Sequence, residues 1–104
     1  MKNTLLAILL LSASVAHADW RNPEAPFDAT KNDAVTKQIS WHISKDIQKT
    51  CEQEHVKRGF AKPTWRVDAC SFWKGNTCDI FTKPNPTMHD MGHELRHCYQ
   101  GNYH

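Results

Sequence analysis

The sequence predicts a small α+β domain that is held together by two disulfide bonds. Removing a predicted signal peptide, residues 1–18, from the 104 residues leaves about 86, near the size below which a hydrophobic core alone gives little stability. The apolar pattern of this part changes from a helical spacing to strand alternation and then back to a helical spacing. Its four cysteines are an even number, which favours two disulfides.

The N-terminal segment is typical of a secretory signal peptide. A short basic start is followed by a largely apolar run over residues 4–15 and by the cleavage motif Ala16-His17-Ala18, so cleavage is expected before Asp19. The apolar run is too short to span a bilayer, and we therefore expect no membrane anchor after signal cleavage. The sequence thus predicts a periplasmic or secreted protein.

The charged residues nearly balance and are interspersed along the chain. Lys and Arg number 13 and Asp and Glu 11, which gives a formal net charge of +2. No basic run is interleaved with aromatic residues, the pattern typical of proteins that bind nucleic acids. We therefore expect no nucleic-acid partner.

Residues 19–32 are predicted to form an extended N-terminal arm. This segment is rich in Pro, Asn and Asp, and we expect one of its large apolar residues, Trp20 or Phe27, to pack against the body of the protein. The remaining residues, 33–104, are predicted to form a single domain.

An amphipathic helix is predicted from residue 33 to about residue 57, with Asn32 or Asp33 as its cap and its end near Gly59. Apolar residues recur here at every fourth position: Val35, Ile39, Ile43, Ile47 and Cys51. His42 and His55 are expected to lie on this helix as surface or core-edge residues rather than as ligands.

Residues 61–82 are predicted to form a β-hairpin. Residues Trp65–Ala69 alternate between apolar and polar, residues 74–77 contain the turn pair Gly75-Asn76, and Cys78–Thr82 form the second strand.

The last helix is predicted to span Met88 to about Gln100. Thr87 is its expected N-cap, with Asp90 in the third helical position, and Gly101 can adopt the left-handed conformation that ends it.

On a helical wheel this last helix carries an apolar stripe and a row of histidines on nearly opposite sides. The stripe is Met91, Leu95 and Cys98, and the row is His89, His93 and His97. We expect the stripe to pack on the rest of the domain and the histidines to face a cleft, with Glu94 beside them.

Residues 93–97 have the pattern H-E-x-x-H, in which two imidazoles four residues apart on a helix can share one metal ion. Gly101 allows the chain to fold back, so His104 is the expected third ligand beside His93 and His97. The expected ion is Zn²⁺, and Glu94 is the expected general base that accepts a proton from a metal-activated water. The candidate hydrogen-bond donors to the resulting oxyanion are Tyr99, Tyr103 and His89.

Two pairings of the cysteines remain open at this point. Cys70 with Cys78 would close the hairpin and leave Cys51 with Cys98 to join the two helices. Alternatively, Cys78 pairs with Cys98 and Cys51 with Cys70, because a strand of about five residues and a helix of about eleven both span roughly 16 Å, so their far ends can meet.

The H-E-x-x-H segment, with a strand before it, resembles the zincin class of zinc metallopeptidases. Gly101 and His104 extend the resemblance to the metzincin pattern H-E-x-x-H-x-x-G-x-x-H, with one additional residue before Gly101. Residues 92–104 also resemble the end of small exported bacterial proteins of uncharacterised function, G-H-E-x-x-H-C-x-x-G-x-x-H. The resemblance implies a minimal zincin-like fold, with His93, His97 and His104 as zinc ligands and Glu94 as general base.

These observations predict an exported zinc-dependent hydrolase, most simply a metallopeptidase with a peptide or protein substrate. Two alternatives belong to other classes. One is a periplasmic metal-binding protein without catalysis. The other is a disulfide-linked interaction module in which the histidines are incidental.

Overall fold

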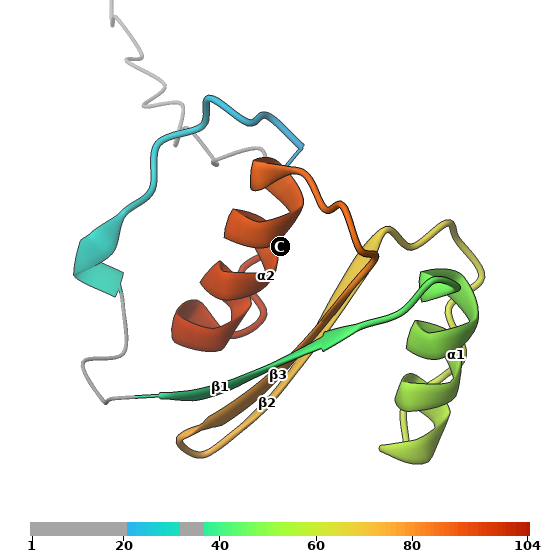
Figure 1. Cartoon of the computed structure of the whole chain (residues 1–104). Coiled ribbons are helices and arrows are strands. Elements are labelled where there is room, and N and C mark those ends of the chain that lie inside the picture. Colours follow the sequence, from blue (N-terminus) through green and yellow to red (C-terminus); the bar gives the residue numbers. More distant parts are fainter. Residues whose placement is uncertain (1–20, 32–36) are drawn as a thin grey trace, which may run out of the picture.

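A three-stranded sheet with one helix on each face forms the body of the protein (Figure 1). The computed structural model describes residues 21–31 and 37–104, so the predicted signal peptide, Trp20 and the predicted helix caps Asn32 and Asp33 lie outside the described residues. The elements in chain order are a 3₁₀ turn (Ala29–Lys31), β1 (Gln38–Ile43), α1 (Ile47–Lys57), β2 (Ala69–Lys74), β3 (Thr77–Thr82) and α2 (Met88–Gln100).

The central strand of the sheet is β3, since the strand order is β1-β3-β2. It pairs in parallel with β1, from Gln38 opposite Thr77 onward, and antiparallel with β2. Side chains alternate between the two faces of a strand. The α1 face therefore carries Cys70, Phe72 and Phe81, and the α2 face carries Ser71, Trp73, Cys78 and Ile80. The small α+β class predicted from the sequence is confirmed.

The prediction of one helix over residues 33–57 is wrong for its first half, where the described residues form β1. Ile39, Trp41 and Ile43 also alternate, and a spacing of four is a multiple of two, so the apolar pattern fitted a strand as well as a helix. These side chains are β-branched or aromatic, which favours a strand. The helix instead begins at Ile47, where the Asp46 carboxylate accepts a hydrogen bond from the Lys49 amide at 3.1 Å.

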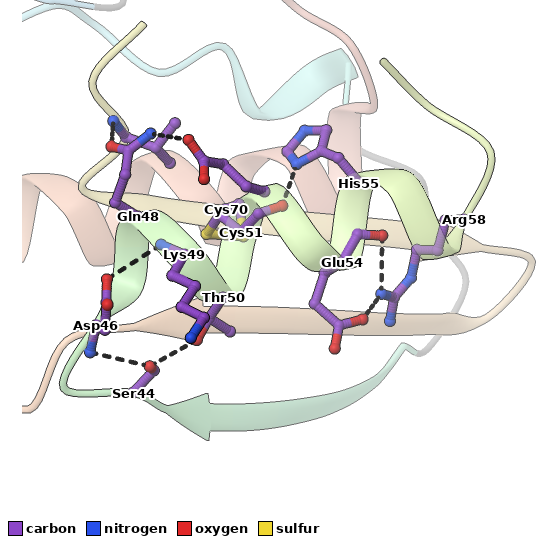
Figure 2. The surroundings of a disulfide bond; sticks show 12 residues. Ser44, Asp46, Gln48, Lys49, Thr50, Cys51, Glu54, His55, Arg58 and Cys70 are labelled. Carbon is purple, nitrogen blue, oxygen red and sulfur yellow. Dashed lines mark hydrogen bonds and ion pairs between the residues drawn. A yellow bond between two sulfur atoms is a disulfide. The ribbon is translucent and has the colours of Figure 1, made fainter. Parts of the chain in front are cut away.

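His42 consequently lies on β1 and not on a helix. Its ring stacks on Phe81 with 4.4 Å between centroids, and its Nε2 atom lies 2.9 Å from the Asp79 carboxylate. His55 lies on α1 as predicted, with its Nδ1 atom 2.7 Å from the carbonyl oxygen of Cys51 (Figure 2). Neither histidine lies on α2, which carries the H-E-x-x-H pattern.

The hairpin forms, but its first strand begins at Ala69 rather than at Trp65. The side chain of Gln48 on α1 accepts a hydrogen bond from the Val67 amide at 2.7 Å and donates one to the Trp65 carbonyl at 3.2 Å. Two backbone groups of this segment are thus bonded to α1 instead of to a neighbouring strand. Gly75 has a φ of 58°, the positive value that a two-residue hairpin turn requires at its first position.

The predicted limits of α2 are confirmed at both ends. The Thr87 hydroxyl accepts a hydrogen bond from the Asp90 amide at 3.0 Å. Gly101 follows the helix with φ 64° and ψ −138°, a conformation that residues other than glycine rarely adopt.

Each helix is linked to the sheet by one disulfide. Cys51 of α1 is bonded to Cys70 of β2 (Figure 2), and Cys78 of β3 is bonded to Cys98 of α2. This is the second of the two predicted pairings. The hairpin pairing fails because Cys70 and Cys78 point to opposite faces of the sheet, so their side chains cannot meet.

The two faces bury cores of different size. The α1 face holds Ile47, Cys51, Val67, Cys70, Phe72 and Phe81, whereas the buried cluster on the α2 face is Cys78, Ile80 and Cys98, with Tyr99 packed against it.

Two disulfides in so small a domain indicate an oxidising, extracellular environment. Among the described residues, no helix is both long and apolar enough to cross a bilayer.

Candidate metal centre

Three of the predicted site residues converge beside α2. The Nε2 atoms of His93 and His97 lie 3.2 Å apart, and the Nε2 atom of His104 lies 3.2 Å from the first and 2.9 Å from the second. His93 and His97 are on successive turns of α2, and His104 comes from the segment that follows it. We call these residues the histidine cluster.

The spacing of these nitrogens fits a tetrahedral ion. With zinc–nitrogen bonds of about 2.0–2.1 Å, three ligand atoms of a tetrahedron lie roughly 3.3 Å from one another. Three imidazole nitrogens that face one point cannot all donate hydrogen bonds to each other, whereas a cation there attracts all three lone pairs. The histidine cluster is therefore a group that could bind a metal ion.

His97 is prepared for this role by its other contacts. Its Nδ1 atom lies 2.8 Å from the Gly101 carbonyl oxygen, to which it donates, so Nε2 carries the free lone pair. Its ring stacks on Trp73 of β2, with 5.2 Å between centroids and 6° between planes. Burial lowers the pKa of His97 to about 4, and burial together with the neighbouring histidines lowers that of His93 to about 4. Both imidazoles are therefore neutral at neutral pH, as metal ligands must be.

The turn after α2 brings His104 back to the helix. The Gly101 amide donates to the His97 carbonyl at 2.9 Å, and the Tyr103 amide donates to the Gly101 carbonyl at 3.1 Å. The Tyr103 hydroxyl then donates to the His93 carbonyl at 3.2 Å. This short loop reverses the direction of the chain, so the C-terminus lies beside α2 (Figure 1). The His104 side chain can therefore reach His93 and His97.

Glu94 is buried between α2 and β2, with 5% of its surface exposed. Burial is the main cause that raises the pKa of Glu94 to about 7; the charge of Asp90 adds to this effect, and a hydrogen bond with Ser71 partly offsets it. Glu94 and the three histidines line one open cleft of about 420 Å³, which β2 and residues 65–68 also border. The carboxyl group that sequence analysis proposed as a base is thus in the same cleft as the histidine cluster.

The predicted orientation of α2 is wrong. Of its apolar stripe only Cys98 is buried, since Leu95 is 42% exposed and Met91 is half-buried. The side that carries Glu94 and His97 faces β2 instead. A hydropathy pattern cannot predict this arrangement, because the buried residues His97 and Glu94 are polar. His97 stacks on the Trp73 indole, and Glu94 forms a hydrogen bond with Ser71.

The other predicted donors are not directed at the histidine cluster. The Tyr103 hydroxyl is bonded to a backbone carbonyl, and Tyr99 packs against the buried Cys78, Ile80 and Cys98. The His89 ring lies 6.2 Å from the His93 ring, one turn further along the helix.

Sequence reasoning missed Ser71 and Trp73 as parts of the site. Their alternation in the hairpin was available as a signal, since residues 71 and 73 must share one face of a strand. The sequence did not indicate against which face of the sheet α2 packs.

A second cavity of about 810 Å³ adjoins the cleft and shares four lining residues with it: His55, Ser71, Trp73 and Asn102.

Comparison of the chain with protein-family models, with curated proteins and with solved structures found no match.

Proposed function

We propose that the protein is an exported zinc-dependent hydrolase, most simply a metallopeptidase, with His93, His97 and His104 as metal ligands and Glu94 as general base. The observation that carries the proposal is the triangle of three imidazole nitrogens within 3.2 Å of one another, in the same cleft as a buried carboxyl group. Neutral imidazole nitrogens suit zinc among the common metal ions, and three of them leave one tetrahedral position open.

A bound Zn²⁺ would supply Lewis acidity, which polarises a carbonyl group and lowers the pKa of water toward neutrality. Glu94 would accept the proton of the attacking water and return it to the leaving amine. A carboxyl group with a pKa of about 7 is suited to both steps near neutral pH. Ser71, through its hydrogen bond, would keep the carboxyl group directed into the cleft.

The surroundings of the histidine cluster support a peptide or protein substrate. The cleft is open, and the larger cavity beside it, which Phe72, Trp73 and Lys74 line along the edge strand β2, shares four lining residues with it. Two adjoining hollows along an edge strand leave room for a chain-like substrate, because an extended peptide can add to a sheet at its edge. The predicted signal peptide and the two disulfides support a periplasmic or secreted location.

Metal analysis tests the site directly. We expect the purified protein to retain one equivalent of zinc, measured by mass spectrometry after dialysis, and His104→Ala to lose most of it. His89→Ala is the matched control, because His89 lies on the same helix outside the histidine cluster and its substitution should leave the zinc content unchanged. Absence of zinc from the wild-type protein under zinc-replete conditions would contradict the metal site.

A second measurement separates catalysis from binding. Glu94→Gln should retain zinc but lower the turnover of fluorogenic peptides by at least about 10²-fold, since it removes the base. If this variant cleaves as fast as the wild type, the base assignment is wrong. If neither protein cleaves any peptide but both bind zinc, the protein binds metal without peptidase activity.

A further inference from the structure

We propose that Arg96 is a positioning residue for the metal site: it connects the N-terminal arm to the turn that carries His104. Its guanidinium lies over the ring of Phe27 and over the ring of Tyr103. The proposal rests on the metal site proposed above, and it assigns a role in that site to the N-terminal arm.

The contacts of Arg96 reach both neighbours. Its Cζ atom lies 4.0 Å from the centroid of the Tyr103 ring and 5.4 Å from that of Phe27, both within the range of a cation–π interaction. Its Nε atom donates to the Gln100 side chain at 2.8 Å, and the Gln100 amide donates to the Asp28 carbonyl at 2.8 Å. One turn of α2 thus contacts the arm through a cation–π contact with Phe27 and through a hydrogen bond from the Gln100 side chain to the Asp28 backbone.

The arm presents these groups in a local turn of its own. The Asp28 carboxylate accepts hydrogen bonds from the Thr30 amide at 3.0 Å and from the Thr30 hydroxyl at 2.6 Å. The Lys31 amide donates to the Asp28 carbonyl at 3.3 Å, the same oxygen that Gln100 contacts. Residues 28–31 of the arm thus form a turn through their own hydrogen bonds, and this turn presents the Asp28 carbonyl oxygen to Gln100.

Tyr103 transmits the contact to the histidines. Its ring centroid lies 4.5 Å from that of His97, 5.0 Å from that of His104 and 5.5 Å from that of His93. Because Tyr103 directly precedes His104, the position of its backbone determines where the His104 side chain begins. A turn of four residues loses much conformational entropy on ordering, and the ring contacts of Tyr103 offset that cost.

The affinity for zinc should depend on the fraction of molecules in which the turn that carries His104 is ordered. If the turn is ordered in only a fraction of molecules, the apparent dissociation constant rises by the inverse of that fraction. Arg96 and Phe27 increase the ordered fraction, so they should strengthen zinc binding without contacting the ion. Their greatest possible effect is the loss seen when His104 itself is removed.

The test compares zinc dissociation constants, measured by competition with a chromophoric chelator. We expect Arg96→Met to weaken binding by about fivefold and Phe27→Ala by about threefold, in line with the strength of partly exposed cation–π pairs. Arg96→Lys should lie between Arg96→Met and the wild type, because it keeps the charge but loses the planar guanidinium. Two matched controls should stay within about twofold of the wild type. Lys57→Met removes an exposed cation from α1, and Phe60→Ala removes a partly exposed ring that contacts His55 and Phe72.

A double-mutant cycle identifies the route of the effect. If Arg96 acts through His104, Arg96→Met should leave the residual zinc affinity of His104→Ala unchanged. An equal loss in both backgrounds would overturn the proposal, because it would make Arg96 a general stabiliser of α2. Unchanged zinc affinity in Arg96→Met would overturn it as well.

A second readout does not depend on zinc. In the metal-free protein, nuclear Overhauser contacts between the rings of Tyr103 and His104 should weaken in Arg96→Met and persist in Lys57→Met. If the wild-type protein binds no zinc, the proposed function fails, while this measurement still decides whether Arg96 orders the turn. Unchanged contacts in Arg96→Met would refute the positioning role.

Discussion

Removing the disulfide that links α2 to the sheet should weaken metal binding, whereas removing the one that links α1 to the sheet should not. The two removals should lower the free energy of unfolding by the same amount. The perturbations are the paired substitutions Cys78→Ala with Cys98→Ala and Cys51→Ala with Cys70→Ala. The bridges close loops of nearly equal length, with sequence separations of 20 and 19 residues. They therefore form a matched pair.

The expected loss of stability follows from loop closure. Releasing a loop of about 20 residues restores roughly 11 cal/mol/K of entropy to the unfolded chain, or about 3 kcal/mol at 25 °C. Each paired variant should thus lose about 3 kcal/mol in free energy of unfolding, measured by urea denaturation of the metal-free protein. A domain of this size has a total stability of roughly 5–10 kcal/mol, so both variants should remain folded at low temperature.

The effect on the metal site should differ because the two helices depend differently on their bridges. On the α1 face, Ile47, Val67, Phe72 and Phe81 remain as a buried core when Cys51 and Cys70 are replaced. On the α2 face, the buried cluster without its two cysteines is reduced to Ile80, with Tyr99 packed beside it. We therefore expect α2, which carries two of the three histidines, to be less firmly held on β2 and β3.

Zinc affinity measured by chelator competition separates the two variants. The Cys78/Cys98 variant should bind zinc at least about tenfold more weakly than the wild type, and the Cys51/Cys70 variant should stay within about twofold. Equal zinc affinities would refute the reasoning that the bridge on the α2 face orders the site. A loss of stability below about 1 kcal/mol in both variants would refute the loop-closure argument itself.

Two further outcomes are expected. The pKa values of His93 and His97 are lowered to about 4 from an ordinary value of 6.5, so the unfolded chain binds more protons and the metal-free protein should lose stability as the pH falls from about 6.5 to about 4. The pKa of Glu94 is raised from 4.5 to about 7, so protonation of Glu94 stabilises the folded protein as the pH falls through this range and partly offsets the loss. Glu94→Gln should therefore make the decline in stability steeper, as measured by urea unfolding at several pH values in the presence of a chelator. Gly101→Ala should cost about 1–3 kcal/mol of unfolding free energy, because its φ of 64° and ψ of −138° strain any other residue, and it should also weaken zinc binding through His97 and His104. Unchanged stability and zinc affinity in Gly101→Ala would show that the turn does not need glycine.

The sequence predicted the C-terminal half of the fold because local signals there agree with one another. Thr87, Asp90 and Gly101 mark the ends of α2, and the pair Gly75-Asn76 marks the hairpin turn. Each of these features depends on hydrogen bonds or dihedral angles within a few residues of itself. Such features can be inferred without knowledge of the tertiary structure.

β1 was missed because its assignment depends on a distant partner. The strand is ordered by its parallel pairing with β3, some forty residues later, which no local signal announces. All six of its residues are exposed, so its apolar side chains do not follow the burial that an amphipathic pattern presupposes. The indole of Trp41 instead donates a hydrogen bond to the buried Thr82 at 3.0 Å.

The rotation of α2 about its axis explains most of what the sequence could not specify about the site. At 100° per residue, the predicted apolar face of Met91, Leu95 and Cys98 and the observed buried face of Glu94, His97 and Cys98 differ by roughly 70°. This rotation moves Glu94 into the interface with β2 and leaves His93 at its edge. It also directs Arg96 away from the sheet, to the side where Phe27 and Tyr103 meet it. A single rotation about the helix axis thus accounts both for the raised pKa of Glu94 and for the contact between Arg96 and the N-terminal arm.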